Sequence, residues 1–283
     1  MESDAIASKR TLFDQTCFNV LSYLEKFEEI CEIDFIAKDG VQAHDMSYWE
    51  RKNFPYKLPS DLKAFYGIFN GLSCRWKVEV SGKRVQIGEM LLSQLESISR
   101  GTIEGQHNSP DSNISIMDSK NCVAFALDGF SAEFGSTYLV YKLVEPESAV
   151  RGGTQIDQSN KLRSSEDPEV WFKDLSARWH FLTYTFTNYM RLLVTHLGIF
   201  GWQMAYSPEG LHESTHHWMR FFCMERLCVD LNHQYNRKVS VAGNNSNSIS
   251  LSAFNLNDKR KGLQGSNGSG YDSEKNGGRY TAK

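Results

Sequence analysis

The sequence predicts an α+β fold, in which a mixed, mostly antiparallel sheet packs against helices. The first observation behind it is an amphipathic helix with apolar residues at i, i+3, i+4 and i+7: Leu62, Phe65, Tyr66 and Phe69. The second is the segment Trp76–Val80, where apolar and charged residues alternate as in a half-buried strand. The third is a pair of strand-like stretches, 123–127 and 137–143, rich in residues that favour strands. Strands that follow a face-covering helix in this way indicate a sheet that rests on helices.

The N-terminal part of the chain is expected to form a helix and then a short strand. Residues 1–10 show no periodic pattern. The apolar residues that follow form a helical stripe: Phe13, Cys17, Val20, Leu21, Leu24 and Cys31. Ile33 and Phe35 then indicate a short strand, and Tyr48 and Trp49 fall in a short helical or loop segment.

The helix near residue 60 carries start and stop signals. Pro59 fixes φ where a missing N–H costs little, Ser60 is a candidate N-cap, and Asp61 suits the positive end of the helix dipole. Asn70-Gly71 tolerates left-handed φ and is expected to end the helix. After the strand Trp76–Val80, Ser81-Gly82 predicts a hairpin turn.

The second half of the chain alternates ordered segments with polar loops. Met90–Ser99 is expected to form a short helix, and polar loops are expected at 100–119 and 144–167. The segment Ala177–Leu197 is apolar nearly all round, so it predicts the strongest helix, either central to a core or shared with a partner. One more helix is expected over Leu211–Leu231.

We expect one domain over residues 11–231, followed by a disordered basic tail, 232–283. Asn, Ser, Gly and Lys dominate this tail without periodicity. It holds eight Lys/Arg and three Asp/Glu, whereas the whole chain of 283 residues has a net charge of −3, so the body is acidic. A chain with this charge has no strong bulk attraction to nucleic acid, which we do not expect as a partner.

Cysteine use and hydropathy bear on the compartment. The six cysteines are scattered without C-x-x-C spacing, which indicates reduced thiols in a cytoplasmic protein. The most apolar window, 181–200, has Arg191 near its centre, and a central arginine costs about 2.5–3.5 kcal/mol on membrane-insertion scales. We therefore expect no membrane association.

Residues 212–216 read His-Glu-Ser-Thr-His, which matches the H-E-x-x-H pattern of zinc hydrolases. On a helix this spacing places His212 and His216 on one face to bind zinc, with Glu213 as general base. A catalytic zinc site needs a third protein ligand, and Met219 stands where the extended motif has glycine. The alternative is a polar helix face with no metal. Phosphate-binding glycine motifs are absent from the sequence, so no cofactor is expected.

Large aromatic residues are the candidates for a protein interface, where Trp and Tyr are enriched. The candidate set is Trp171, Trp179, Tyr184, Tyr189 and Trp202. The alternative is a packed core, because large aromatics dominate cores as well. Both interpretations hold if one face is buried and the other docks a partner.

The segment Leu58–Trp76 resembles the SMI1/KNR4 domain, whose core reads roughly LPxDLKxFY, then NGxxxxW. The resemblance implies an SMI1/KNR4-like α+β domain that is used mainly to bind other proteins. Helix, Asn-Gly and strand form a common unit, so this segment alone is moderately specific.

A second segment, Val170–Trp202, is similar to a family of tubulin polyglutamylase complex subunits. The pattern carried over is WF, WHFLT, TFT, Y, RLL, THLG and W. These letters fall on Trp171, Phe172, Trp179, His180, Phe181, Leu182, Thr183, Thr185, Phe186, Thr187, Tyr189, Arg191, Leu192, Leu193, Thr195, His196, Leu197, Gly198 and Trp202. With the first segment, the resemblance covers about residues 46–206.

The second resemblance implies a non-catalytic subunit of such a complex. A tubulin-tyrosine-ligase-like partner would then add glutamate to tubulin, while this chain would act as a scaffold or position that partner on microtubules. The implied partners are other subunits of the complex and tubulin. The implied location is the cytoskeleton, at microtubules and near the centrosome or cilium.

Two other functions stay open from the sequence. One is a general SMI1/KNR4 protein-binding module unconnected to tubulin, and the other is a hydrolase that uses zinc at His212 and His216. The basic tail also has two interpretations, a weak and salt-sensitive contact with acidic tubulin tails or a solubilising segment.

Overall fold

The computed structural model describes residues 15–101, 103, 122–129, 134–144, 163–164 and 167–243. The chain divides into two compact units, Met1–Arg237 and Lys238–Lys283, and the architecture below is that of the first. The expected tail lies mostly outside the described residues, as do most of the polar loops predicted at 100–119 and 144–167. No helix in the described part of the chain is long and apolar enough to cross a membrane.

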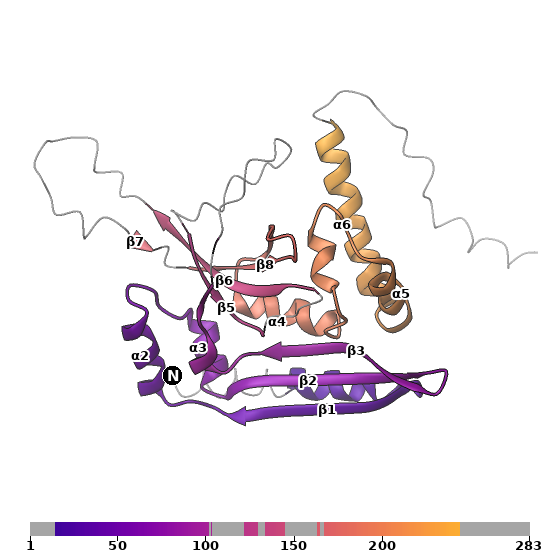
Figure 1. Cartoon of the computed structure of the whole chain (residues 1–283), viewed down its shortest axis with the longest axis horizontal. Helices are drawn as coiled ribbons and strands as arrows, with labels where there is room; N and C mark the ends of the chain where they lie inside the picture. Colours follow the sequence, from indigo (N-terminus) through magenta and orange to yellow (C-terminus); the bar gives the residue numbers. More distant parts are fainter. Residues whose placement is uncertain are drawn as a thin grey trace, which may run out of the picture. The chain divides into compact units, whose positions relative to one another are not determined.

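A three-stranded antiparallel sheet forms one layer, in the order β1 (Ile30–Asp39), β2 (Phe69–Val80) and β3 (Lys83–Leu92). Helical residues 15–24 precede β1. The predicted hairpin between β2 and β3 is confirmed, with Val80 paired to Lys83. Ser81 and Gly82 both have positive φ, which suits the twist of a two-residue hairpin turn. Figure 1 shows β2 between its two neighbours.

Two helices connect β1 to β2: α2 (Ala43–Lys52) and α3 (Ser60–Tyr66). The predicted helix near residue 60 is confirmed, although Pro59 rather than Ser60 occupies the N-cap position. The helix ends at Tyr66, before Asn70-Gly71. These two residues lie inside β2, where Gly71 keeps its positive φ of 89°.

The second layer is a six-stranded sheet whose strand pairs are all antiparallel. Its main path runs β4 (Arg100–Gly101), β5 (Cys122–Ala126), β6 (Ser136–Val144), β8 (Glu169–Lys173) and β9 (Trp179–Thr183), and β7 (Arg163–Ser164) pairs with β6. The predicted α+β class is confirmed. The expected single mixed sheet is corrected to two antiparallel sheets, because among the described strands β1–β3 form one sheet and β4–β9 the other.

The helix predicted over Ala177–Leu197 is wrong in its first half. Residues 179–183 form β9, and only Phe186–Thr195 form a helix, α4. Ala177 has a φ of 60° in the turn that returns the chain from β8 to β9. Backbone pairing with β8 satisfies the polar groups of residues 179–183. The helix begins only after Thr185, whose hydroxyl accepts from the Asn188 N–H and caps α4. The helical periodicity was therefore overridden by a strand partner.

Three further segments differ from expectation. The predicted helix Met90–Ser99 is the end of β3 followed by a short 3₁₀ turn, η1 (Leu95–Ser97). The predicted helix Leu211–Leu231 is two helices, α5 (Glu213–Phe222) and α6 (Met224–Gly243), because the backbone breaks at Cys223. Helix α6 runs past residue 231, where the sequence predicted disorder to begin.

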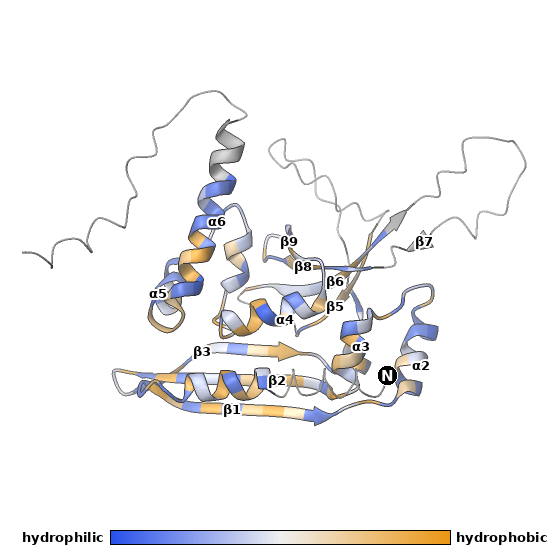
Figure 2. Cartoon of the chain, turned by 180° about the vertical axis from the view of Figure 1, so that it is seen from behind, coloured by the Kyte–Doolittle hydropathy of each residue, from blue (hydrophilic) through white to orange (hydrophobic). Residues whose placement is uncertain are grey.

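Helix α4 lies between the two sheets (Figure 1), and its apolar residues face both. Phe186 meets Phe65 of α3 with ring centroids 5.3 Å apart, and Tyr189 lies near Trp202 of η4 (Trp202–Tyr206). Figure 2 shows apolar residues alternating with polar ones along the strands of the three-stranded sheet. Because each sheet presents an apolar face to α4, this helix is the centre of one shared core.

Candidate functional site

The five predicted interface residues divide sharply in the structure. Trp171, Trp179, Tyr189 and Trp202 are 1–3% exposed, whereas Tyr184 is 68% exposed. Tyr189 and Trp202 belong to the main core, and Trp171 and Trp179 belong to a smaller cluster on the six-stranded sheet. The packed-core interpretation therefore describes four of the five. Tyr184 alone offers surface to a partner.

The two segments that carried the resemblances meet in the core. Asp61, from the first segment, accepts hydrogen bonds from the Thr187 backbone N–H at 2.7 Å and from its hydroxyl at 3.0 Å. The Trp76 indole N–H donates to the Leu197 carbonyl at 2.8 Å. Residues more than a hundred positions apart thus fix α3 and β2 to α4.

The Thr-His-Leu-Gly sequence at 195–198 is a structural junction. Leu197 and Gly198 both have positive φ, and a side chain at Gly198 would meet the Glu89 carbonyl oxygen at 2.5 Å. The Glu89 N–H donates to the Gly198 carbonyl at 2.8 Å, which joins the end of α4 to β3. The left-handed conformation and the close approach together require glycine here.

His196 ties the same junction to α6. Its Nε2 lies 2.8 Å from an Asp230 oxygen, its Nδ1 lies 2.6 Å from the Leu192 carbonyl, and its ring stacks on Trp202. Arg226 pairs with Asp230 and donates to the Tyr206 hydroxyl. Since each of these buried polar groups has a partner, the network fixes α6 to the end of α4 and to η4.

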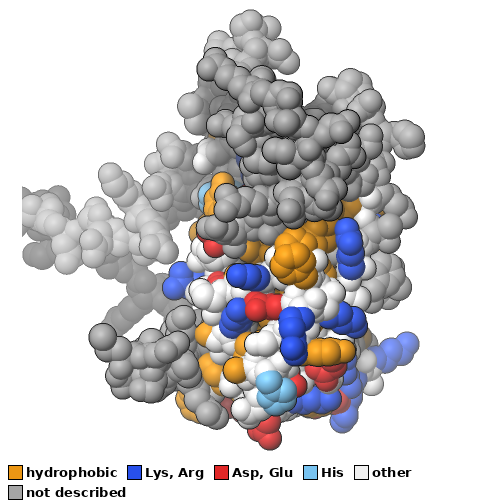
Figure 3. Space-filling model, turned by 90° about the vertical axis from the view of Figure 1, so that its left-hand side faces the viewer, with side chains coloured by type: hydrophobic (Ala, Val, Ile, Leu, Met, Phe, Trp, Pro, Cys, Tyr) orange, Lys and Arg blue, Asp and Glu red, His pale blue; other side chains and the backbone are white. Residues whose placement is uncertain are grey.

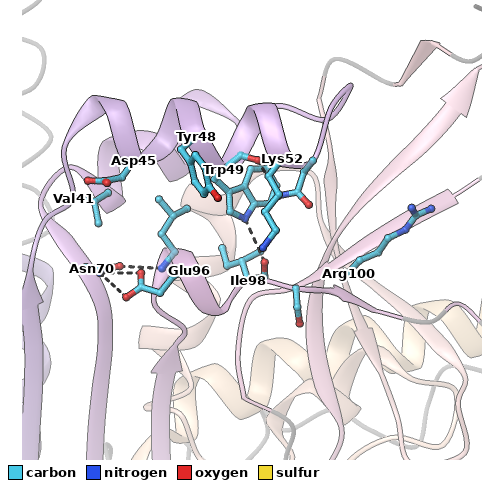
Figure 4. Close-up of a pocket in the computed structure, with 12 residues that line it drawn as sticks. Val41, Asp45, Tyr48, Trp49, Lys52, Asn70, Glu96, Ile98 and Arg100 are labelled. Atoms are coloured by element: carbon cyan, nitrogen blue, oxygen red, sulfur yellow. Dashed lines mark hydrogen bonds between the residues drawn. The ribbon is translucent and has the colours of Figure 1, made fainter.

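A groove of about 700 Å³ lies between α2 and the segment that runs from η1 to β4, and we call it the α2 groove. Its floor is apolar and rigid. The Trp49 indole N–H donates to the Ile98 carbonyl at 3.3 Å, and the Trp49 ring packs edge-on against Phe125. Figure 4 shows Tyr48 beside Trp49 on α2, above Glu96 and Ile98.

The charges of the α2 groove are unequally engaged. Asp45 accepts from the Gln42 N–H at 3.1 Å and pairs with His44, and Glu96 accepts from the Asn70 amide at 3.2 Å. No hydrogen bond or ion pair to another described residue is found for the side chains of Lys52 and Arg100, which are exposed. In Figure 4 the Lys52 ammonium lies beside the Trp49 indole, while Arg100 extends to one side.

The surface around the α2 groove is aromatic and basic. Tyr48 is 63% exposed and Phe54 is 82% exposed. Figure 3, which faces this end of the molecule, shows Lys and Arg side chains gathered around hydrophobic ones, with Asp and Glu side chains among them. Exposed aromatic side chains beside cations give this surface both apolar area and positive charge that a ligand can contact.

A second groove, of about 720 Å³, lies among helical residues 15–24, the end of α4, α5 and α6, and we call it the apolar groove. Its lining includes Tyr23, Phe221, Met224 and Val229, each more than a third exposed. The Tyr23 hydroxyl donates to the Phe222 carbonyl at 2.8 Å, and burial together with Glu225 raises the pKa of Tyr23. Arg226 is committed to Asp230, and we find no ion pair for Glu225 among the described residues.

One group of metal-ligating side chains stands close together in the described residues: Asp174, His180 and Glu209. Arg178 lies between the two carboxylates and pairs with both. Burial alone would raise the pKa of Asp174, but hydrogen bonds from His180 and Arg178 lower it below its usual value. A metal ion would have to displace the guanidinium, so the arrangement is that of an ion-pair network.

The H-E-x-x-H segment takes another geometry. His212 is the N-cap of α5, where its Nδ1 lies 2.9 Å from the Ser214 hydroxyl and accepts from the Ser214 N–H. Neither His212 nor His216 lies in the one metal-ligating group found among the described residues. The cap accounts for His212 without a metal.

Neither groove could be predicted from a pattern in the sequence. Tyr48 and Trp49 are adjacent on a short helix that showed no clear amphipathic stripe. Lys52 and Arg100 are far apart in the chain, so no spacing pattern links them. The signal that could have found the α2 groove is the pair of neighbouring aromatic residues next to the run Arg51-Lys52.

The fold and these surfaces define an α+β protein with one charged groove and one apolar groove. Over 240 residues the chain is 28% identical to tubulin polyglutamylase complex subunit 2 of Homo sapiens, covering 78% of this chain and 73% of the human protein. It is 29% identical to the Rattus norvegicus protein of the same name over 234 residues, covering 76% of this chain and 73% of the relative. The Mus musculus protein of that name is 28% identical over the same length.

No family model matches the chain, and no solved structure matches it. The SMI1/KNR4 resemblance therefore stays a prediction. The similarity to subunit 2 of the tubulin polyglutamylase complex, predicted from residues 46–206, is confirmed.

Proposed function

We propose that the chain is a non-catalytic subunit of a tubulin polyglutamylase complex. The observation that carries this proposal is its similarity to three mammalian proteins with that name, over about three quarters of its length. Within the complex, a tubulin-tyrosine-ligase-like partner would add glutamate to tubulin tails. This chain would hold that partner and position it on microtubules, in the cytoplasm near the centrosome or cilium.

The apolar groove supports a role in assembly. Phe221 and Met224 are each 51% exposed and line the same groove, so together they offer apolar area that a partner could bury. An amphipathic helix of another subunit would bury these side chains in a groove that is already formed. Glu225 at its rim favours a partner helix with a basic residue opposite.

The test is affinity purification of the tagged chain from its own cells, followed by an assay of the eluate for ATP-dependent glutamylation of tubulin. We expect a ligase-like subunit and activity to co-elute, while the purified chain alone is inactive. A chain that glutamylates tubulin alone, or an eluate without ligase, would contradict the proposal. In the second case the general protein-binding module becomes the better interpretation.

The docking surface is tested in the same assay with Phe221→Glu/Met224→Glu. A buried charge at a helix-binding groove is expected to reduce recovery of the ligase at least tenfold, on the scale of about 1.4 kcal/mol per factor of ten. The matched control is Val80→Glu/Val85→Glu on the β2–β3 hairpin, where both residues are exposed to a similar degree. Equal recovery with both variants would exclude the apolar groove as the docking site.

A further inference from the structure

The α2 groove has features that a scaffold does not require. Its floor is fixed by the hydrogen bond from Trp49 to the Ile98 carbonyl, and its acidic side chains have partners within the protein. Its cations, Lys52 and Arg100, have none among the described residues. We propose that this groove binds a glutamate-rich acidic peptide, and that its occupant is the acidic tail of tubulin on which the complex acts.

Charge complementarity supports this occupant. Asp45 and Glu96 already accept hydrogen bonds and occupy the end of the groove near the start of α2. Lys52 lies in the last turn of α2, and Arg100 lies on β4. The groove therefore has an acidic end and a basic end. An acidic peptide can form two charge contacts, with Lys52 and Arg100, at the basic end of the groove. A basic peptide would be favoured only at the opposite end, beside Asp45 and Glu96.

The floor of the groove supplies the second contact. Trp49 and Ile98 are buried at its base, and Tyr48 stands exposed beside them. An aromatic or aliphatic side chain of the peptide can pack here without rearrangement, because the Trp49 ring is held by Ile98 and Phe125. A preorganised floor lowers the entropy lost when the peptide binds.

Two further cations lie close in the chain to the residues of the groove. Arg51 and Lys57 are exposed, and no ion pair to another described residue is found for either side chain. Lys63 does not contribute, because it pairs with Glu50 at 2.6 Å. The attraction of Lys52 and Arg100 for an acidic peptide is expected to fall with salt and to become a repulsion when both are replaced by glutamate.

This inference rests on the proposed function, because polyglutamylation is what makes an acidic tail the relevant ligand. The binding experiment itself does not depend on the complex. The 283-residue chain is titrated by calorimetry with a synthetic glutamate-rich peptide that carries one tyrosine. The same peptide with glutamine in place of glutamate is the ligand control.

Lys52→Glu/Arg100→Glu is the test variant, and Lys83→Glu/Arg220→Glu is its matched control with the same change in net charge. All four positions are exposed, so circular dichroism is expected to show unchanged folding. Reversal of the groove cations is expected to weaken binding of the glutamate peptide at least tenfold, whereas the control variant changes it less than about twofold. Binding by the wild type should also weaken between low and high salt.

Three results would overturn the inference: no binding of the glutamate peptide, equal binding of the glutamine peptide, or equal losses in the two variants. Ligase recovery with the wild-type chain is measured in parallel. If the ligase is recovered but the peptide does not bind, the groove inference fails and the proposed function stands. If the ligase is not recovered, the proposed function fails whatever the peptide does, and the tubulin tail is withdrawn as occupant.

Discussion

The α2 groove and the apolar groove have nearly the same volume, about 700 and 720 Å³, and differ in what holds them. The α2 groove has a buried tryptophan for its floor and charged side chains on its walls. The apolar groove keeps Phe221 and Met224 at its surface, and its one arginine is turned inward to Asp230. The first is built to select a ligand by charge, and the second to bury apolar area.

The difference teaches that one fold can present two grooves suited to different kinds of ligand. Assembly with a permanent partner gains from an apolar groove, because burial of apolar area is strong and insensitive to salt. Contact with a charged and exchanging ligand gains from a shallow electrostatic site, because such a site binds and releases quickly. A substitution that had the same effect in both grooves would contradict this distinction between them.

The largest expected effect is at the floor of the α2 groove. Trp49→Ala removes a buried indole and leaves the Ile98 carbonyl without its donor, so we expect a loss of about 3–5 kcal/mol in the free energy of unfolding. Phe221→Ala removes a half-exposed ring of the apolar groove and should cost less than about 1 kcal/mol. Urea unfolding of both variants measures the difference. Equal losses would mean that the two grooves are built in the same way.

A pH titration sharpens the comparison, because one half-buried carboxyl outside both grooves is expected to make the free energy of unfolding depend on pH. Burial raises the pKa of Asp128 to about 7, although the Thr137 N–H donates to it and opposes the rise. Between its usual pKa and 7 the folded protein holds a proton that the unfolded chain releases. Protonated Asp128 therefore stabilises the folded protein at low pH, and this contribution to the free energy of unfolding is lost as pH rises through 7.

Asp128→Asn removes this dependence, since the amide oxygen can still accept from Thr137. As pH rises from 4 to 7, we expect the free energy of unfolding of the variant to increase relative to that of the wild type by a few kcal/mol. The scale is on the order of 1.4 kcal/mol for each unit by which the pKa is shifted. Above pH 7 the difference should stay constant. Thermal unfolding at several pH values measures it, and a difference that is independent of pH would show that Asp128 is ionised in the folded protein.

The smallest expected effect is at Tyr184, the exposed member of the aromatic set. Tyr184→Ala should change the free energy of unfolding by less than about 0.5 kcal/mol, because a residue that is 68% exposed has few contacts to lose. If Tyr184 is a partner contact, recovery of the ligase falls while stability does not. Recovery equal to that of the wild type would leave the apolar groove as the one surface proposed here for the ligase.

Much of the fold could be predicted from local pattern. The helix at Ser60–Tyr66, the hairpin at Ser81-Gly82 and the strands β5 and β6 follow from periodicity and turn chemistry, which act between near neighbours. The same local signals failed at residues 179–183. Those residues read as helix, and became a strand because β8 was available to pair with them.

The candidate sites were predicted less well, for a related reason. For Trp171, Trp179, Tyr189 and Trp202 the sequence left two interpretations open, an interface and a packed core, and the structure shows all four buried. Large aromatic residues serve cores and interfaces equally, so residue type alone does not separate the two. Only Tyr184 kept the exposure that an interface needs.

The sequence by itself determined the α+β class, the acidic body and basic tail, and the similarity to a polyglutamylase complex subunit. These depend on composition, short-range spacing and matched residues. Only the tertiary structure decided that Asp61 would cap α4, that Trp76 would bond to Leu197, and that Lys52 and Arg100 would share one groove. These contacts join residues far apart in the chain, and their formation depends on how sheets and helices pack, which no local pattern encodes.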